Sequence, residues 1–157
     1  MGGHLLAEAL PGGRSRLRRV ARHEAGHWLV AQQEELAVRR VLVGTRACLK
    51  AGLRCNGATE FDLPEQVRLP LEDLRRWSRV LQAGMVAEAL LEGEARGGAD
   101  DRALLGRIWG LSGQDVATAQ REQRRARREV EQLLKKRLDE LDGVAERLLE
   151  GLEPEPA

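Results

Sequence analysis

Residues 15–34 read SRLRRVARHEAGHWLVAQQE, and this stretch decides the fold. Its apolar residues recur at spacings of three and four, which is typical of an α-helix with one buried face. These residues are Leu17, Val20, Ala21, Ala25, Trp28 and Leu29. Ser15 is a candidate N-cap, so we expect a helix from Ser15 to about Glu34. The glycine-rich residues 1–14 before it should form a flexible lead-in.

A β element should follow this first helix. Residues 36–43 are rich in valine and leucine and are followed by Gly44, a pattern typical of a strand. Residues 49–61 contain Gly52, Gly57 and Phe61 and offer a second strand or an extended rim. We therefore expect a small β-sheet or hairpin after the first helix.

The second helix should begin near Pro70 and end at Gly93. Proline favours the first turn of a helix, and glycine favours the position just after the last turn. Gly84 interrupts an otherwise strong helical pattern, which suggests that another backbone approaches this helix closely. The pattern thus predicts a long helix packed tightly against a neighbour.

Further helices should complete the chain. Asp100 or Asp101, at the end of the glycine-rich loop 96–101, can cap one of them. Asp115 can start a long charged helical stretch toward residue 150, with Gly143 as a candidate interruption. Its expected buried residues are Val130, Leu134, Leu138, Leu141, Ala145 and Leu148. Residues 151–157 should form a disordered tail. The whole pattern predicts a mainly α fold of the α+β class, with one domain over residues 15–150.

The composition is that of one globular domain. The 157 residues are 42% hydrophobic and 32% charged, and the charges nearly cancel to a net +1. No apolar run approaches the roughly 20 residues that span a bilayer, and the N-terminus does not resemble a signal peptide. We therefore expect a cytoplasmic protein with no membrane span and no nucleic-acid partner. In that compartment Cys48 and Cys55 should be free thiols.

The first helix carries the run His23-Glu24-Ala25-Gly26-His27. One helical turn is about 3.6 residues, so both imidazoles lie on one face and can hold the same Zn²⁺. Glu24 can then take a proton from a water that the zinc activates for attack on a peptide carbonyl. This is the arrangement of His-Glu-x-x-His metallopeptidases. The competing interpretation is a chance match, but two of the three histidines in the chain fall in this motif.

The residue types alone do not identify the third zinc ligand. A catalytic zinc usually takes three protein ligands and keeps one position free. The remaining histidine, His4, lies in the expected lead-in, which lacks the rigid support that sites need. A carboxylate should therefore complete the site, and the candidates are Glu88, Asp100 and Asp101. Chemistry alone does not choose among them, since one of the two aspartates can equally be a helix cap.

Three motifs, taken in order, resemble the peptidase domain of the FtsH-type, ATP-dependent zinc metalloproteases. Residues 23–27 match that family's His-Glu-Ala-Gly-His. Residues 83–88, AGMVAE, are similar to its Gly/Ala-Gly-Arg-Ala-Ala-Glu, and residues 97–101, GGADD, to its Gly-Ala-Ser-Asn-Asp. A weaker match covers residues 141–150. The resemblance spans residues 20–150 and implies a helical zinc-peptidase fold.

The resemblance also implies a role for each candidate residue. The zinc ligands it implies are His23, His27 and Asp101. Glu24 would be the general base, while Glu88 and Asp100 would support the site without binding the metal. The implied activity is hydrolysis of peptide bonds by a zinc-dependent endopeptidase.

The sequence also departs from that family. Family members carry a membrane anchor and an ATP-driven unfolding module ahead of the peptidase domain, and the 22 residues before His23 hold neither. Trp28 stands where the family usually has a small residue, and Met85 stands in place of an arginine. We therefore expect an endopeptidase without its own ATPase that acts on peptides or unfolded proteins. The β segment near residues 38–43 should bind substrate in extended form.

A second function class stays open. The chain can instead be a catalytically weak or inactive zinc-binding module that regulates or pairs with another protease, and a fourth protein ligand would favour this alternative. A separate ATPase or protease partner and a homo-oligomer are both compatible with the sequence. We interpret the arginine-rich residues 14–22 and 121–128 as solvated helix faces, because charges of both signs are mixed and no aromatic residues are interleaved.

Overall fold

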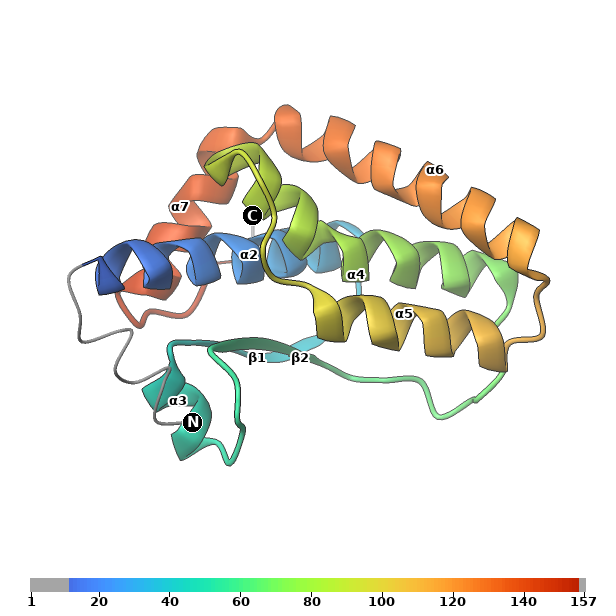
Figure 1. Cartoon of the computed structure of the whole chain (residues 1–157), viewed down its shortest axis with the longest axis horizontal. Helices are drawn as coiled ribbons and strands as arrows, with labels where there is room; N and C mark the ends of the chain where they lie inside the picture. The colour runs from blue at the N-terminus through green and yellow to red at the C-terminus, as the bar shows by residue number, and fades with distance from the viewer. Residues whose placement is uncertain (1–11, 156–157) are drawn as a thin grey trace.

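The computed structural model describes residues 12–155. Helices make up most of this part, and a two-stranded antiparallel sheet lies on one side (Figure 1). The elements are α2 (Gly13–Gln33), β1 (Val38–Val43), α3 (Thr45–Lys50), β2 (Gly57–Phe61), α4 (Leu71–Glu92), α5 (Ala99–Leu111), α6 (Val116–Lys135) and α7 (Leu138–Leu149). The expected mainly helical fold with a small hairpin after the first helix is confirmed. None of the helices within residues 12–155 combines the length and apolar character needed to cross a bilayer.

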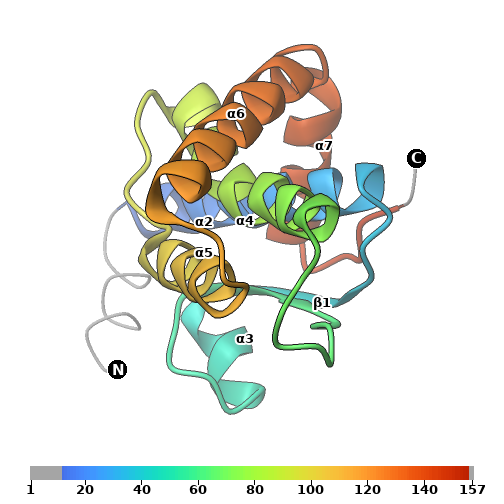
Figure 2. The ribbon, with the colours of Figure 1, turned by 90° about the vertical axis from the view of Figure 1, so that its right-hand side faces the viewer.

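The two long helices α2 and α4 lie at the centre. The helix α7 packs on α2 and α6 packs on α4, while the hairpin and α5 cover the other side of this pair (Figure 2). Every residue of α2 from His23 to Ala31 is buried. Because neighbours cover α2 from several directions, the His-Glu-x-x-His motif lies in the interior of the fold rather than on an open helix face.

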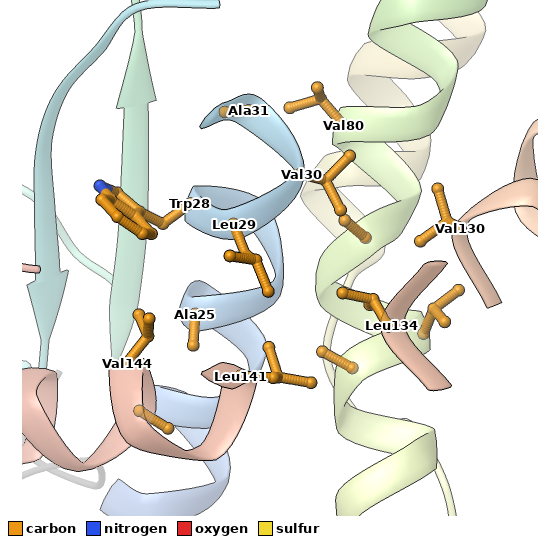
Figure 3. Close-up of a cluster of buried hydrophobic side chains, with 14 of the residues drawn as sticks. Ala25, Trp28, Leu29, Val30, Ala31, Val80, Val130, Leu134, Leu141 and Val144 are labelled. Atoms are coloured by element: carbon orange, nitrogen blue, oxygen red, sulfur yellow. The ribbon is translucent and has the colours of Figure 1, made fainter. Parts of the chain in front are cut away.

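The main core joins four helices. Leu29 and Val30 of α2, Val80 of α4 and Leu134 of α6 are each 0% exposed. Figure 3 shows Val30 directed toward α4, whereas Trp28 lies on the side of α2 that faces the strands. Trp28 is 6% exposed and belongs to this core. The indole therefore packs behind the motif, which explains why a large residue is tolerated there.

A second apolar cluster joins α4 to α5 and to the segment before α4. It consists of Leu69, Leu74, Trp77, Leu81, Leu105 and Trp109. The indole of Trp109 donates a hydrogen bond of 2.8 Å to the hydroxyl of Ser78, so its polar edge is satisfied inside the protein. This cluster anchors α5 against α4.

The helix termini agree in part with the sequence analysis. Asp115 caps α6, and its carboxylate accepts a 2.7 Å hydrogen bond from the backbone N–H of Thr118. Gly93 ends α4 in the left-handed conformation, with φ at 89°. Ser15 is not an N-cap, because α2 already begins at Gly13. Pro70 is the N-cap of α4 and not its first residue.

Two further expectations need correction. The chain forms the short helix α3 between the strands, where no helix was expected. The last helical stretch breaks at residues 136–137 and not at Gly143, which lies inside α7. The break lets α7 turn back to bury Leu141 and Leu148 against α2, and it leaves Leu138 38% exposed. A single straight helix would carry that apolar face away from α2.

The ends of the expected domain lie partly outside the description. Of the lead-in 1–14, residues 1–11 fall outside the described part, and Gly13 and Arg14 belong to α2. Of the expected tail 151–157, residues 156–157 fall outside it, and the carbonyl of Glu153 accepts hydrogen bonds from Arg147.

The hairpin pairs β1 with β2 in antiparallel register. Val41 lies opposite Thr59, and Val43 lies opposite Gly57, with an irregularity between Val38 and Arg40. Successive strand residues point to opposite faces, and Thr59 points toward α2, where its hydroxyl meets Glu24. The hairpin therefore brings β2 to the His-Glu-x-x-His motif.

The helices α2 and α4 touch at Gly26. A Cβ atom at this position would collide with the carbonyl oxygen of Ala83 and would lie 2.5 Å from the Cβ of Ala87. The middle residues of the motif are thus held against the backbone of α4. Only glycine permits this approach, since any side chain would push the two helices apart.

We predict opposite effects for two glycine-to-alanine variants. Gly26→Ala should lower the free energy of unfolding by about 1–3 kcal/mol, because the added methyl overpacks the α2–α4 contact. The control Gly143→Ala should raise it by up to about 1 kcal/mol, because that helical glycine has no other atom within 4 Å of the added Cβ. Urea unfolding followed by circular dichroism measures both. Equal stability of the two variants would contradict the close contact at Gly26.

Candidate metal centre

Three side chains from two helices converge on one point. The Nε2 atoms of His23 and His27 each lie 3.0 Å from Oδ2 of Asp101. One ligand atom of each residue lies within 4.8 Å of the other two, so the group can hold a metal ion. The structure thus brings together the three residues that the resemblance implied as ligands. Asp100 is exposed and stays outside this group.

The chain path before α5 decides which aspartate points inward. Gly98 precedes α5 in the left-handed conformation, with φ at 109°. A Cβ atom there would collide with the side chain of Met85, so glycine is needed for both reasons. Asp101 follows in the first turn of α5, where the positive end of the helix dipole favours a carboxylate. The expectation that Asp100 or Asp101 caps this helix is wrong, because neither side chain makes a cap hydrogen bond.

Gly84 makes room for the two imidazoles. A Cβ atom at this position would collide with Nε2 of both histidines and would lie 2.5 Å from Cδ2 of His23. The close neighbours of Gly84 are the side chains of His23 and His27 and not the backbone that we expected from the sequence. This glycine therefore shapes the site itself.

Each imidazole is oriented by a partner on α4. Nδ1 of His27 donates to the carbonyl oxygen of Val80 at 2.8 Å, since a carbonyl can only accept. Nδ1 of His23 lies 2.9 Å from Oε1 of Glu88, which is a carboxylate and again an acceptor. Partners of this kind fix the tautomer and leave Nε2 as the free ligand atom. Glu88 therefore supports the site, as the resemblance implied.

Glu88 is itself held firmly. Nη1 of Arg19 donates to it at 2.8 Å, and the backbone N–H groups of Arg96 and Gly97 donate at 2.5 and 3.3 Å. Burial opposes the charged carboxylate, but the bonds from His23, Arg96 and Arg19 outweigh it and lower the pKa of Glu88 to about 2. A permanently ionised Glu88 keeps the proton of His23 on Nδ1.

These tautomers have a consequence for the centre. With both Nδ1 atoms acting as donors, neutral imidazoles would present two lone pairs to the oxygen of Asp101. Three acceptors at 3.0 Å need either protons or a cation between them. The donor set of two nitrogens and one carboxylate oxygen therefore fits a metal ion.

Without a metal, protons fill this role. Burial disfavours the charged imidazole of His23, but its hydrogen bonds to Asp101 and Glu88 outweigh burial and raise the pKa of His23 to about 10. The pKa of His27 is also raised, because Asp101 outweighs the effect of burial. The same bonds overcome burial at Asp101 and hold its pKa below the usual range. A metal ion must therefore displace protons in order to bind.

Glu24 lies beside the ligand cluster but is not part of it. Its side chain is buried, and Oε1 accepts a 2.8 Å hydrogen bond from the hydroxyl of Thr59. Burial raises the pKa of Glu24, and the nearby imidazoles of His27 and His23 only partly offset this. A carboxylate with a raised pKa is suited to accepting and returning a proton near neutral pH.

The site opens into a cavity of about 680 Å³. His23, Glu24 and Asp101 line it on one side. The residues 53–59, which include the first half of β2, line it on the other. A second cavity of about 770 Å³ lies at the far end of β2, and Thr59 lines both. The strand beside the metal group is therefore β2, while Arg39 and Arg40 of β1, within the segment 38–43 that we expected to bind substrate, line the second cavity. That expectation stays a prediction.

Sequence reasoning missed three contributors to the site. Thr59 binds Glu24 and Arg19 binds Glu88, while Val80 contributes only its backbone carbonyl. Arg19 fell in a run that we interpreted as a solvated face, yet its side chain is only 21% exposed. The side-chain pattern cannot reveal a backbone carbonyl, and Thr59 lies 35 residues after Glu24 in the sequence, beyond β1 and α3.

Comparison with known proteins adds no assignment. No family model, curated protein or solved structure matches this chain. The function is therefore inferred from the geometry of the site and from the motifs themselves.

We predict that neighbouring aspartates differ sharply in metal binding. Asp101→Asn should weaken Zn²⁺ binding by roughly 100-fold, because it removes the charge of a ligand. The matched variant Asp100→Asn should stay within about twofold of the unmodified protein, since its side chain is exposed and outside the group. Titration of Zn²⁺ against a competing chelator measures both. Equal loss in the two variants would contradict the ligand set.

We also predict that Zn²⁺ binding releases protons. At pH 7 at least one proton should leave, because the pKa of His23 is raised to about 10 in the metal-free protein. The affinity should then fall as the pH is lowered, since protons compete for the same nitrogens. Calorimetry in two buffers of different ionisation enthalpy measures the number released. A value near zero would contradict the protonated metal-free state.

Proposed function

We propose that this protein is a zinc-dependent endopeptidase that hydrolyses peptide bonds of peptides or unfolded chains. The observation that carries the proposal is the position of Glu24. A buried carboxylate lies next to a convergent group of two histidines and one aspartate, and Glu24, His23 and Asp101 line the same cavity. A general base beside an open metal position is the arrangement that metal-assisted hydrolysis requires.

Zinc is the metal that suits this donor set best. Two imidazole nitrogens and one carboxylate oxygen are typical ligands of catalytic zinc, whereas Ca²⁺ and Mg²⁺ prefer sites built from oxygen alone. His23, His27 and Asp101 would hold the ion through the atoms that face one another. When bound, zinc would supply Lewis acidity that polarises a peptide carbonyl and eases the deprotonation of water.

Glu24 supplies the proton transfer in this proposal. Its Oε1 is engaged by Thr59, while Oε2 lies beside the backbone of Gly57, 3.0 Å from where a Cβ atom would stand. The glycine thus lets β2 approach α2 closely, since such a Cβ atom would also collide with Cγ1 of Val20. From this position Glu24 would take a proton from the attacking water and deliver it to the leaving amine nitrogen. Its raised pKa supports both halves of this exchange.

The strand β2 offers a place for the substrate. In the two-stranded sheet of the described residues, β1 occupies one edge of β2 and the other edge has no partner strand. An extended peptide can add to such an edge through backbone hydrogen bonds. It would then pass Thr59, next to Glu24, with one cavity on either side. This geometry favours chains that are already extended over folded proteins.

The alternative function is a zinc-binding module without activity. A closed site with a fourth protein ligand would support it, but among residues 12–155 only three side chains form the donor group. The buried Glu24 also has no function in a purely structural site. The order of the three motifs that resemble FtsH-type peptidases further supports the endopeptidase.

We predict that zinc-loaded protein cleaves an unfolded substrate such as casein and that Glu24→Gln abolishes cleavage. The amide cannot accept the proton, so the rate should fall at least about 100-fold. Gel electrophoresis and release of new amino termini measure the activity.

Zinc content must be equal in both proteins, because Glu24 is not expected to bind the metal. Equal cleavage by both would contradict the role of Glu24. Absence of cleavage by the unmodified protein, with one zinc bound per chain, would favour the inactive binding module.

A further inference from the structure

One arginine of the substrate cavity has no ionic partner. Arg54 lies in the loop between α3 and β2 and lines the 680 Å³ cavity. Its side chain is exposed, and no hydrogen bond or ion pair joins it to another residue within 12–155. The other two arginines of the cavity wall are paired. Arg19 binds Glu88, and Arg96 binds Glu94, each at 2.8 Å.

The carboxylates that face the cavity centre cannot neutralise Arg54. Glu24 is bonded to Thr59, and Asp101 is shared between two imidazoles. Asp100 also lacks an ion pair, but it lies on the opposite wall in the first turn of α5, where the helix dipole offsets part of its charge. The hairpin wall therefore presents an uncompensated positive charge.

Arg54 lies only a few residues along the chain from Thr59, where the scissile bond would lie. Arg54 precedes β2 by three residues, and Thr59 within β2 marks the position of Glu24. A chain lying along β2 advances about 3.3 Å per residue. A substrate residue one or two places from the bond beside Thr59, on the side of Gly57, thus reaches the end of the strand where Arg54 stands.

The opposite end of β2 has a different character. The 770 Å³ cavity is lined by Phe61, Leu63 and Leu104, together with two arginines. Those arginines are neutralised, since Arg40 pairs with Glu60 at 2.6 Å and Arg39 pairs with Asp62 at 3.4 Å. The protein should therefore select substrate residues by their charge on one side of the scissile bond only.

We propose that Arg54 binds a carboxylate of the substrate within about two residues of the scissile bond, on the side that lies over Gly57. Arginine suits this function, because its planar guanidinium can donate two parallel hydrogen bonds to one carboxylate. The carboxylate is either an Asp or Glu side chain or the free C-terminus of the peptide. This inference rests on the proposed function, because it places the substrate along β2.

Peptide binding tests the proposal without requiring activity. The zinc-loaded Glu24→Gln protein is titrated with fluorescent peptides that differ only by Glu or Gln at successive positions, all with amidated C-termini. A further arm compares a free C-terminus with an amidated one. We expect one position, or the free C-terminus, to tighten binding roughly three- to tenfold at low salt, and less at high salt.

Variants assign the effect to Arg54. In the Glu24→Gln background, Arg54→Ala should remove the preference for the carboxylate, and Arg54→Glu should reverse it toward a Lys peptide. The control is Arg46→Ala, since Arg46 of α3 is also exposed but does not line either cavity. A preference that survives Arg54→Ala, or the absence of any preference or binding, would overturn the proposal.

The two proposals fail in different ways. If the peptides bind with an Arg54-dependent preference but the unmodified protein cleaves none of them, the carboxylate site stands and the endopeptidase does not. If the unmodified protein cleaves peptides equally well with Glu and Gln at every position, and regardless of the C-terminus, the endopeptidase stands and the carboxylate site does not.

Discussion

The contact between α2 and α4 is the constraint on which the site depends. Gly26 lets the two backbones meet, and Gly84 leaves the space in which the imidazoles of His23 and His27 lie. The residues at 80, 84 and 88 of α4 are spaced by four, so one face of this helix offers in turn a carbonyl acceptor, a gap and a carboxylate. The histidines on α2 repeat at the same interval. The matched spacing on the two helices thus orients the imidazoles of His23 and His27 in the metal-free protein.

Burial of the charged groups of this site costs folding free energy. Burying imidazoles and carboxylates is unfavourable unless each finds a partner. Here Asp101 contacts both histidines, and Glu88 contacts His23. In the metal-free protein, protons satisfy these acceptors and hold the group together. Because the three ligand atoms converge in the folded chain, a metal ion that replaced these protons would bind the folded state more tightly than the unfolded chain.

Some features of the site and of the fold can be predicted from local sequence patterns, and others cannot. The spacing of His23 and His27 predicts a shared helix face, because helical periodicity is local. The choice of Asp101 over Asp100 depends on how the chain turns at Gly98, and local chemistry left it open until the resemblance was considered. The proximity of β2 rather than β1 depends on strand order, and the break before α7 depends on packing against α2. These are tertiary constraints that a single-sequence pattern does not contain.

The hairpin gives the strongest argument that the centre is more than structural. A zinc ion that only stabilised the fold would need its ligands and their supports, all of which come from the helices and the loop before α5. Glu24 belongs to neither group, yet it is buried and bonded by Thr59 from the hairpin. Burial of a carboxylate with a raised pKa costs stability. Glu24 is bonded to Thr59, which lines both cavities, so this cost falls where an extended substrate would pass. A catalytic base is expected at such a position.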